Sequence, residues 1–249
     1  MDGIINLNKP LGVTSAKALY RVRKITGQRK SGHAGTLDPA ATGVLVLCLG
    51  KATRLVERIM AQPKVYLAHA RLDVTSATLD AEGRLAPVAV DRVPTLEQVC
   101  DALYGFLGTT LQVPPAVSAV KLGGVPAYRR VRKGEAVAIA PRPVRIDWIE
   151  LVEYQWPQVT IRLCCGRGTY VRAIVRDLGA VLHVGGCLTG LARERVGPFE
   201  LEAACSIEQL EGGADPAAFL MPLSEAERRV QTVTAIAAPA SARVSTGCG

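Results

Sequence analysis

The sequence predicts an α+β (mixed α/β) fold in which a central mixed, mainly antiparallel sheet is flanked by helices. Segments with strand and helix periodicity alternate irregularly along the chain, and several of the strands are joined by short turns. Short turns connect antiparallel neighbours, whereas a doubly wound parallel sheet needs a helix after nearly every strand. With 249 residues, 49% hydrophobic and 21% charged, the chain can bury a substantial core.

The elements of the first half follow from apolar periodicity and from turn residues. Apolar side chains at spacings of three and four predict helices, and short apolar or alternating runs predict strands. Thr14 or Ser15 can cap the first helix. In chain order we expect a strand at 3–8, a helix from 14 with Leu19, Val22 and Ile25 inward, a buried strand at 44–49, a helix at 52–60, a strand at 64–72 and a turn at 78–83.

The second half begins with a capping box, Thr-Leu-Glu-Gln at 95–98, which predicts the start of a helix. Its inward side chains are expected to be Leu96, Val99, Cys100, Leu103 and Leu107. Strands follow at 109–121, 144–152 and 159–165, with a short basic helix or loop at 127–133. Gly168 or Thr169 begins the next helix, whose apolar face is Val171, Ile174, Val175, Leu178 and Leu182. Residues 232–249 lack clear periodicity.

The charge distribution suggests an acidic partner. The formal net charge is +8, and basic residues gather in three places. A solvated charged face would explain any one cluster, but three of them favour nucleic acid. The clusters are residues 3–37, with seven Lys or Arg and no acid, then Arg129, Arg130, Arg132 and Lys133, and finally Arg162, Arg167, Arg172 and Arg176.

Other patterns argue against membrane and metal classes. No apolar run approaches the roughly 18 residues needed to cross a bilayer, and the start of the chain does not resemble a signal peptide. We therefore expect a cytoplasmic protein without membrane association. The seven cysteines are odd in number and lack zinc-finger spacing. Small buried thiols in a reducing compartment are the expectation, with no metal site.

Asp38 is the candidate catalyst on local chemistry. It lies between Gly32 and Gly43 and is the first acid after Asp2. Glycines allow a tight loop, and Pro39 favours an extended conformation at the residue before it. A polyanion attracted to the basic segment would be brought to this single carboxylate. The alternative is an ordinary Asx turn.

A family resemblance supports the catalytic interpretation. The segment Gly-His-Ala-Gly-Thr-Leu-Asp-Pro-Ala-Ala-Thr-Gly at 32–43 resembles the catalytic motif of the bacterial tRNA pseudouridine synthases of the TruB family. The likeness extends in order over about residues 3–223. Further blocks are Leu-Asn-Lys-Pro-Leu-Gly-Val-Thr-Ser at 7–15, the segment 114–134 with Ser-Ala-Val-Lys at 118–121 and Ala-Tyr at 127–128, Gly-Thr-Tyr-Val-Arg at 168–172, and Val-Gly-Pro-Phe at 196–199.

The resemblance implies a fold, an activity and a partner. These are the pseudouridine synthase fold and isomerisation of the T-loop uridine at position 55 of tRNA, with the target base flipped into the site. Asp38 would be essential, acting at ribose C1′/C2′ or at uracil C6. No metal or redox cofactor is needed, the partner is the T-arm of tRNA, and we expect a monomer. The catalytic domain would cover 1–225, and 226–249 would be a short tail, a remnant of the family's C-terminal RNA-binding domain.

Site roles also follow from the resemblance. Tyr66 would stack on the target uracil, and Tyr170 would pack on the other side of the site, linked to removal of the C5 proton. Arg172 would pair with Asp38, and Asp80 would fix the arginine. Remaining matches are Leu191 lining the uracil pocket, Lys9 supporting the active-site wall or a phosphate, and His33 stacking in the RNA where the base leaves.

Without the resemblance, the sequence also allows purely structural roles for several of these residues. Either tyrosine could be a half-buried tyrosine of the sheet. Asp80 could be a turn residue, and Leu191 could be a core leucine. His69 and His183 carry no functional signal.

The chain departs from the family pattern at several positions. Val117 replaces an aromatic residue before Ser-Ala, and Ala77 stands where an acid is common. Leu-Ala-Arg-Glu at 191–194 replaces Leu-Arg-Arg-Thr, a change expected to weaken an RNA or core contact. Only 26 residues follow Leu223, too few for the usual C-terminal domain, so the expected effect is on RNA affinity rather than on chemistry.

Two rival functions remain at this point. A non-catalytic tRNA-binding or folding factor would keep the surface and lose the reaction, but Asp38, Tyr66, Tyr170 and Arg172 are all present. A guide-RNA-directed relative fits poorly, because those chains are generally longer and work in multi-protein particles.

Overall fold

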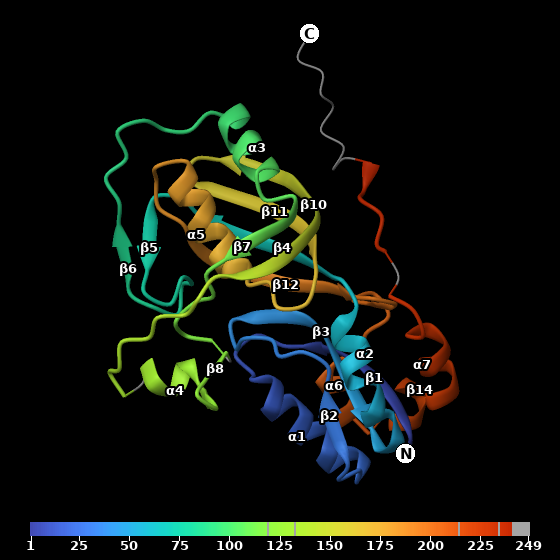
Figure 1. Ribbon diagram of the computed structural model, residues 1–249. Coiled ribbons are helices and arrows are strands. Elements are labelled where there is room, and N and C mark those ends of the chain that lie inside the picture. Colours follow the sequence, from blue (N-terminus) through green and yellow to red (C-terminus); the bar gives the residue numbers. More distant parts are fainter. Residues whose placement is uncertain (119, 132, 214, 234, 241–249) are drawn as a thin grey trace. The chain divides into compact units, whose positions relative to one another are not determined.

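Two units, each formed by two separate stretches of the chain, make up the fold. The computed structural model describes residues 1–118, 120–131, 133–213, 215–233 and 235–240 (Figure 1). Unit 1 combines Met1–Leu67 with Leu191–Ala237, and unit 2 combines Ala68–Gly190 with 238–240. Strands β4 and β12 each begin in one unit and end in the other.

Unit 1 is built on a sheet with the strand order β14-β1-β3-β12; β2 also pairs with β3, and β13 with β12. Only the β3–β12 pair among these is parallel. Its elements are β1 (Gly3–Lys9), α1 (Ser15–Thr26), β2 (Ser31–His33), β3 (Ala41–Leu49), the 3-10 helix η1 (Gly50–Leu55), α2 (Val56–Ala61), the start of β4 (Lys64–Arg71), the end of β12 (Cys187–Val196), β13 (Phe199–Glu200), α6 (Ile207–Glu211), the 3-10 helix η2 (Pro216–Phe219), β14 (Leu220–Pro222) and α7 (Leu223–Arg229).

The apolar run at 44–49 is a strand buried on both faces, as predicted. Val44, Val46 and Cys48 point into a cluster with side chains of η1, α2 and α7. Leu45 and Leu47 point the other way, into a cluster with α1 and α6. Because neighbouring side chains of a strand face opposite sides, a strand with helices on both faces has to be apolar throughout.

Unit 2 has the strand order β4-β11-β10-β7, together with two small hairpins, β5-β6 and β8-β9. Helices α3 and α5 lie next to each other, and α3 also packs on β10 (Figure 1). Its elements are the end of β4, β5 (Val74–Ser76), β6 (Leu85–Pro87), α3 (Leu96–Tyr104), β7 (Gly108–Gln112), β8 (Lys121–Leu122), β9 (Val125–Pro126), α4 (Ala127–Val131), β10 (Arg142–Gln155), β11 (Gln158–Cys165), α5 (Val171–Val181) and the start of β12.

The predicted α+β fold with a mixed, mainly antiparallel sheet is confirmed. The capping box is present as well: Thr95 Oγ1 accepts from the N–H of Gln98 at 3.2 Å, and Gln98 Oε1 accepts from the N–H of Thr95 at 2.9 Å. Two of the side chains predicted to face inward from this helix do not. Leu96 is 59% exposed in its first turn, and Leu107, 39% exposed, lies beyond its last residue.

Element boundaries differ from the sequence predictions where proline or tertiary contacts intervene. The strand predicted at 109–121 stops at Gln112, because Pro114 and Pro115 cannot donate ladder hydrogen bonds. The helix predicted from 168 or 169 begins at Val171, with Tyr170 as its N-cap. The helix predicted at 52–60 begins as a 3-10 turn and becomes α-helical at Val56.

The predicted boundary between 225 and 226 falls inside α7. Ala226 and Val230 are buried in unit 1. The division into a 1–225 domain and a 226–249 tail stays a prediction. Parts of the predicted features lie outside the described residues: Ala119 of the 114–134 block, Arg132 of the second basic cluster, and Thr234 and 241–249 of the tail, with Cys248. Over the described residues, none of the helices is both long and apolar enough to cross a bilayer.

Candidate functional site

Asp38 lies on a loop between β2 and β3, here called the Asp38 loop (residues 34–40). Gly35 has φ +101°, and Gly43, just inside β3, has φ +99°. A Cβ on Gly43 would lie 2.3 Å from the carbonyl oxygen of Arg193. Both positions favour glycine because φ is positive, and Gly43 also needs it because β12 approaches its backbone closely.

Ser15 fixes the residue before Asp38. Its Oγ accepts from the N–H of Leu37 at 2.9 Å and donates to the Leu37 carbonyl at 3.0 Å. Both residues are buried. The helix cap is Thr14, whose hydroxyl accepts from the N–H of Lys17. Of the two residues that could cap this helix, Thr14 is the N-cap and Ser15 holds the Asp38 loop.

Lys9 fixes the residue after Asp38. Its side chain is fully buried, and Nζ donates to the carbonyls of Pro10 at 2.9 Å, Val13 at 2.7 Å and Pro39 at 3.5 Å. The Pro39 carbonyl also accepts from the N–H of Gly12. Of the two roles expected for Lys9, this geometry supports the structural one, in the wall of the site.

Arg193 ties the start of the Asp38 loop to strand β3, and sequence reasoning missed it. It is 1% exposed, with Nε donating to the Val44 carbonyl at 2.7 Å and Nη2 to the Gly35 carbonyl at 3.1 Å. In the sequence it was noted only as part of Leu-Ala-Arg-Glu at 191–194, the segment that departs from the family pattern. No signal in the sequence marked it, because the pairing of Arg193 with Gly43 exists only in the folded sheet.

His33 precedes the Asp38 loop in β2. Burial lowers the pKa of its imidazole, and the positive charge of Arg193 lowers it further. Its Nδ1 is buried without a hydrogen-bond partner among the described residues. The lowered pKa favours the neutral imidazole of His33, and its Nδ1 has no hydrogen bond among the described residues.

The predicted site residues divide between the two units. Unit 1 carries Lys9, His33, Asp38, Tyr66 and Leu191. Tyr66 is partly exposed on β4, and Leu191 is partly buried on β12, opposite Ala41. Unit 2 carries the remaining three: Asp80, Tyr170 and Arg172. The pairing of Asp38 with Arg172 joins residues of different units and stays a prediction.

Arg172 and Asp80 form a buried ion pair in unit 2. Nη1 of Arg172 lies 3.1 Å from Asp80 Oδ2, and the two side chains are 7% and 8% exposed. Nη1 also donates to the Thr78 carbonyl at 2.9 Å, and Nη2 to the Val117 carbonyl at 3.1 Å. The guanidinium is thereby held in one orientation.

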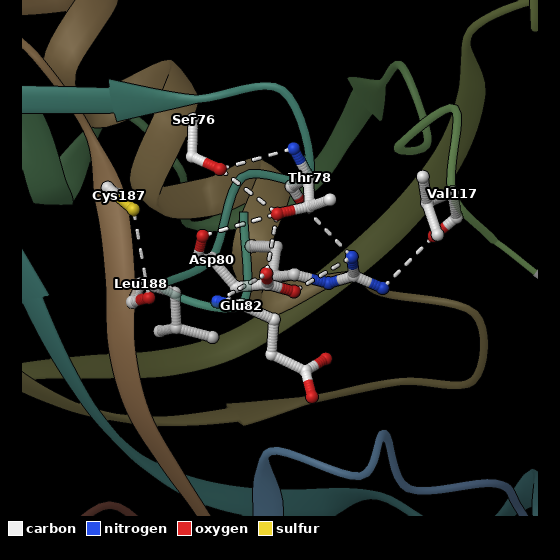
Figure 2. Close-up of polar contacts among 8 residues, drawn as sticks. Ser76, Thr78, Asp80, Glu82, Val117, Cys187 and Leu188 are labelled. Carbon is white, nitrogen blue, oxygen red and sulfur yellow. Dashed lines mark hydrogen bonds and ion pairs between the residues drawn. The ribbon is translucent and has the colours of Figure 1, made fainter. Parts of the chain in front are cut away.

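A short turn holds the carboxylate of this pair. Asp80 Oδ1 accepts from Thr78 Oγ1 at 2.6 Å and from the N–H of Glu82 at 3.2 Å (Figure 2). A parallel bridge between Asp80 and Leu188 fixes the turn against β12. Leu79 adopts φ +65° within it. Asp80 is thus a turn residue and an ion-pair partner at once.

Both departures near this network leave it intact. Val117 contributes its backbone carbonyl, so the loss of an aromatic side chain does not remove the hydrogen bond (Figure 2). Ala77 is exposed, next to Thr78. The hydrogen bonds and the ion pair described for Arg172 and Asp80 use no side-chain atom of Val117 or Ala77.

Tyr170 is the N-cap residue of α5 and so does not lie in a strand. The guanidinium carbon of Arg142 lies 5.1 Å from the centre of its ring. Tyr66, in β4, does lie in a strand.

Comparison with known proteins identifies relatives over most of the chain. The family model "TruB family pseudouridylate synthase (N terminal domain)" matches residues 23–171. A protein of Syntrophus aciditrophicus (strain SB) named tRNA pseudouridine synthase B is 44% identical over 238 residues, covering 94% of this chain and 75% of the relative. The protein of the same name from Mycobacterium tuberculosis (strain ATCC 25618 / H37Rv) is 43% identical over 228 residues, covering 90% and 76%.

A solved structure supports the same fold. A chain in the crystal structure of a Cbf5-Nop10-Gar1 complex superposes with a TM-score of 0.69 at 28% sequence identity. The match covers 91% of this chain and 62% of that one, so the chain spans less than two thirds of its solved neighbour.

Proposed function

Because this chain belongs to the TruB family of pseudouridylate synthases, we propose that it isomerises the T-loop uridine at position 55 of tRNA, with Asp38 as the essential carboxylate. The chain is an isomerase that converts uridine in tRNA to pseudouridine. The position of the uridine, the use of the T-arm and the roles of individual residues are the proposed part.

The reaction is an internal exchange of bonds. The bond from C1′ to N1 breaks, the uracil turns within the site, and C1′ joins C5, while the C5 proton is lost and N1 gains one. Atoms and electrons balance without an oxidant, a reductant or a metal. Asp38 acts either on the ribose, at C1′/C2′, or on uracil C6, and a carboxylate suits both roles.

The observation that carries the assignment of Asp38 is the set of hydrogen bonds from buried side chains to its loop. Leu37 is fixed by Ser15 and Pro39 by Lys9, so both neighbours of Asp38 are held by buried side chains. Arg193 ties the start of the loop to the start of β3. A catalytic group needs this kind of fixed placement, because misplacement by about an ångström can cost a hundredfold in rate.

The other site residues receive roles that fit this chemistry. Tyr66 and Tyr170 would hold the two sides of the flipped uracil, and Leu191 would line the pocket. Arg172, oriented by Asp80, would stabilise the Asp38 carboxylate. His33 would occupy the space that the flipped base leaves in the RNA, which offsets part of the few kcal/mol that base extrusion costs.

The test uses the purified chain with an unmodified tRNA or T-arm stem-loop and no guide RNA or protein partner. We expect one pseudouridine at position 55, located by chemical derivatisation and mass mapping because the two isomers have equal mass. Binding of RNA without any pseudouridine would instead favour the non-catalytic binding factor. Turnover that requires an added guide would favour the guide-directed class.

We also propose that the chain acts as a cytoplasmic monomer whose tail contributes to RNA affinity. The monomer is tested by light scattering of the chain with and without RNA. For the tail, a chain ending at Val233 keeps the buried Val230 and the hydrogen bond from Gln62 to the Thr232 carbonyl. It should keep turnover and bind tRNA more weakly; unchanged affinity would contradict the proposal.

A further inference from the structure

Two neighbouring side chains of unit 2, Gln112 and Arg142, both contact the segment that carries Tyr170. Gln112 ends strand β7 and Arg142 begins strand β10, and the two are direct partners in the antiparallel ladder. Direct partners place their side chains on the same face of a sheet. They therefore reach the same target, and sequence reasoning had singled out neither of them.

Gln112 holds the backbone of Tyr170 at two points. Its Oε1 accepts from the Tyr170 N–H at 2.9 Å, and its Nε2 donates to the Tyr170 carbonyl at 3.2 Å. Gln112 is only 4% exposed. Tyr170 begins α5 with extended backbone angles and does not cap the helix with its own side chain. The amide thus fixes both peptide groups next to the Tyr170 Cα.

Arg142 holds the ring of the same residue. Its guanidinium carbon lies 5.1 Å from the ring centre, within the range of a cation–π contact. Its Nη2 donates to the carbonyl of Gly168 at 2.9 Å, in the turn that leads into Tyr170. The guanidinium is anchored to the backbone on one side and meets the aromatic ring on the other.

We propose that Gln112 and Arg142 are positioning residues that set the place and tilt of the Tyr170 ring against the target uracil. The inference rests on the proposed function, in which Tyr170 contacts the base. During the reaction the detached uracil has no covalent bond to the RNA, so the side chains that contact it determine which of its atoms faces C1′. A small shift of the ring should then lower the rate of rearrangement more than the affinity for RNA.

Substitutions of Gln112 separate positioning from general stability. Gln112→Leu removes both hydrogen bonds. We expect the single-turnover rate at saturating T-arm stem-loop to fall by about 10- to 100-fold, with the Kd for RNA unchanged within about twofold. Leu111→Ala is the matched control, since Leu111 directly precedes Gln112 on β7 and is 73% exposed.

Gln112→Glu adds a readout that a merely structural role would not produce. A protonated carboxyl has one acceptor and one donor and can replace the amide, whereas a carboxylate would face the Tyr170 carbonyl with a second oxygen. Burial favours the protonated form, whereas the positive charge of Arg142 on the same face of the sheet favours the carboxylate, so protonation increases as the pH falls. The single-turnover rate of Gln112→Glu relative to wild type should therefore rise as the pH is lowered from about 8 to about 6.

Arg142→Lys keeps the charge and loses the planar guanidinium. We expect a rate loss of about tenfold at saturating RNA, while Arg145→Lys, on the same strand and 71% exposed, stays near wild type. The rate losses of Gln112→Leu and Arg142→Lys should both act through Tyr170. In a Tyr170→Leu background, Gln112→Leu and Arg142→Lys should each cost less than about threefold, because the ring that they position is gone.

The outcomes are distinct. A wild-type rate for Gln112→Leu, or rate losses that stay the same in the Tyr170→Leu background, would overturn this inference while leaving an active enzyme. If Gln112→Leu does not fold, a rate ratio for Gln112→Glu that does not change with pH is the overturning result. A wild-type chain that makes no pseudouridine overturns the proposed function, and this inference with it.

Discussion

Arg172 and Asp80 form an ion pair of 3.1 Å in which both side chains are less than one tenth exposed. Burying two charges costs several kcal/mol for each ion, and the pair is stable only because further hydrogen bonds complete it. Arg172 donates to two carbonyls, and Asp80 accepts from Thr78 and Glu82. The free energy of unfolding should therefore change differently when one partner of the pair is removed and when both are removed.

Asp80→Ala should lower the free energy of unfolding by about 3–5 kcal/mol, because the buried Arg172 loses the carboxylate that lies 3.1 Å from its Nη1. Urea denaturation measures the loss. The double variant Arg172→Met with Asp80→Leu should regain most of this stability, since it removes both desolvated charges, but should not regain turnover. Asp73→Ala is the control, because the Arg71–Asp73 pair is more exposed and water screens it. Equal losses at Asp73 and Asp80 would contradict the expectation.

Asp38→Asn should abolish turnover and leave RNA binding largely intact. The amide keeps the size of the carboxylate but cannot act as nucleophile or base, so we expect the single-turnover rate to fall by at least about a thousandfold. Pseudouridine mapping measures the rate, and an electrophoretic shift of tRNA measures binding. Asp91→Asn, in an exposed loop of unit 2, provides the matched control. Unchanged turnover in Asp38→Asn would refute the assignment.

Thr14 and Ser15 are adjacent, but their side chains should affect different properties. Thr14→Ala removes a helix cap and should cost about 1 kcal/mol of stability with little change in kcat. Ser15→Ala removes the two hydrogen bonds to Leu37 and should cost about 1–3 kcal/mol and lower kcat, because the residue next to Asp38 is released. Thermal unfolding and turnover are measured for both variants. A lower kcat in Thr14→Ala alone would be the contrary result.

His33 should make stability depend on pH below neutrality. Burial and the charge of Arg193 place the pKa of folded His33 below its ordinary value of 6.5. The unfolded chain therefore takes up the proton at a higher pH than the folded chain does. Stability that is present above pH 6.5 is lost as the pH falls through the lowered pKa.

The variant His33→Gln lacks this titration. Its free energy of unfolding in urea should fall less steeply than that of wild type as the pH is lowered from about 7.5 to about 5. His69 and His183 are present in both chains and so act as an internal reference. Parallel curves for the two chains would show that His33 does not contribute.

Local signals in the sequence were reliable where the physics is local. The capping box at Thr95 needs only residues within one helical turn, and it formed as predicted. The apolar run at 44–49 is a buried strand because its composition leaves no polar face. Predictions failed where neighbours distant in sequence decide burial, as for the exposed Leu96, or where proline stops a ladder early, as after Gln112.

From the sequence alone, apolar periodicity predicted the α+β class, and the motifs that resemble those of the TruB family supplied the list of candidate residues. The tertiary structure alone revealed which side chains hold the candidate residues in place: Ser15 and Lys9 beside Asp38, Arg193 across the loop, and Gln112 with Arg142 on Tyr170. These contacts join residues 22 to 158 positions apart. A hydrogen bond depends on distance and direction in space, and separation along the chain specifies neither.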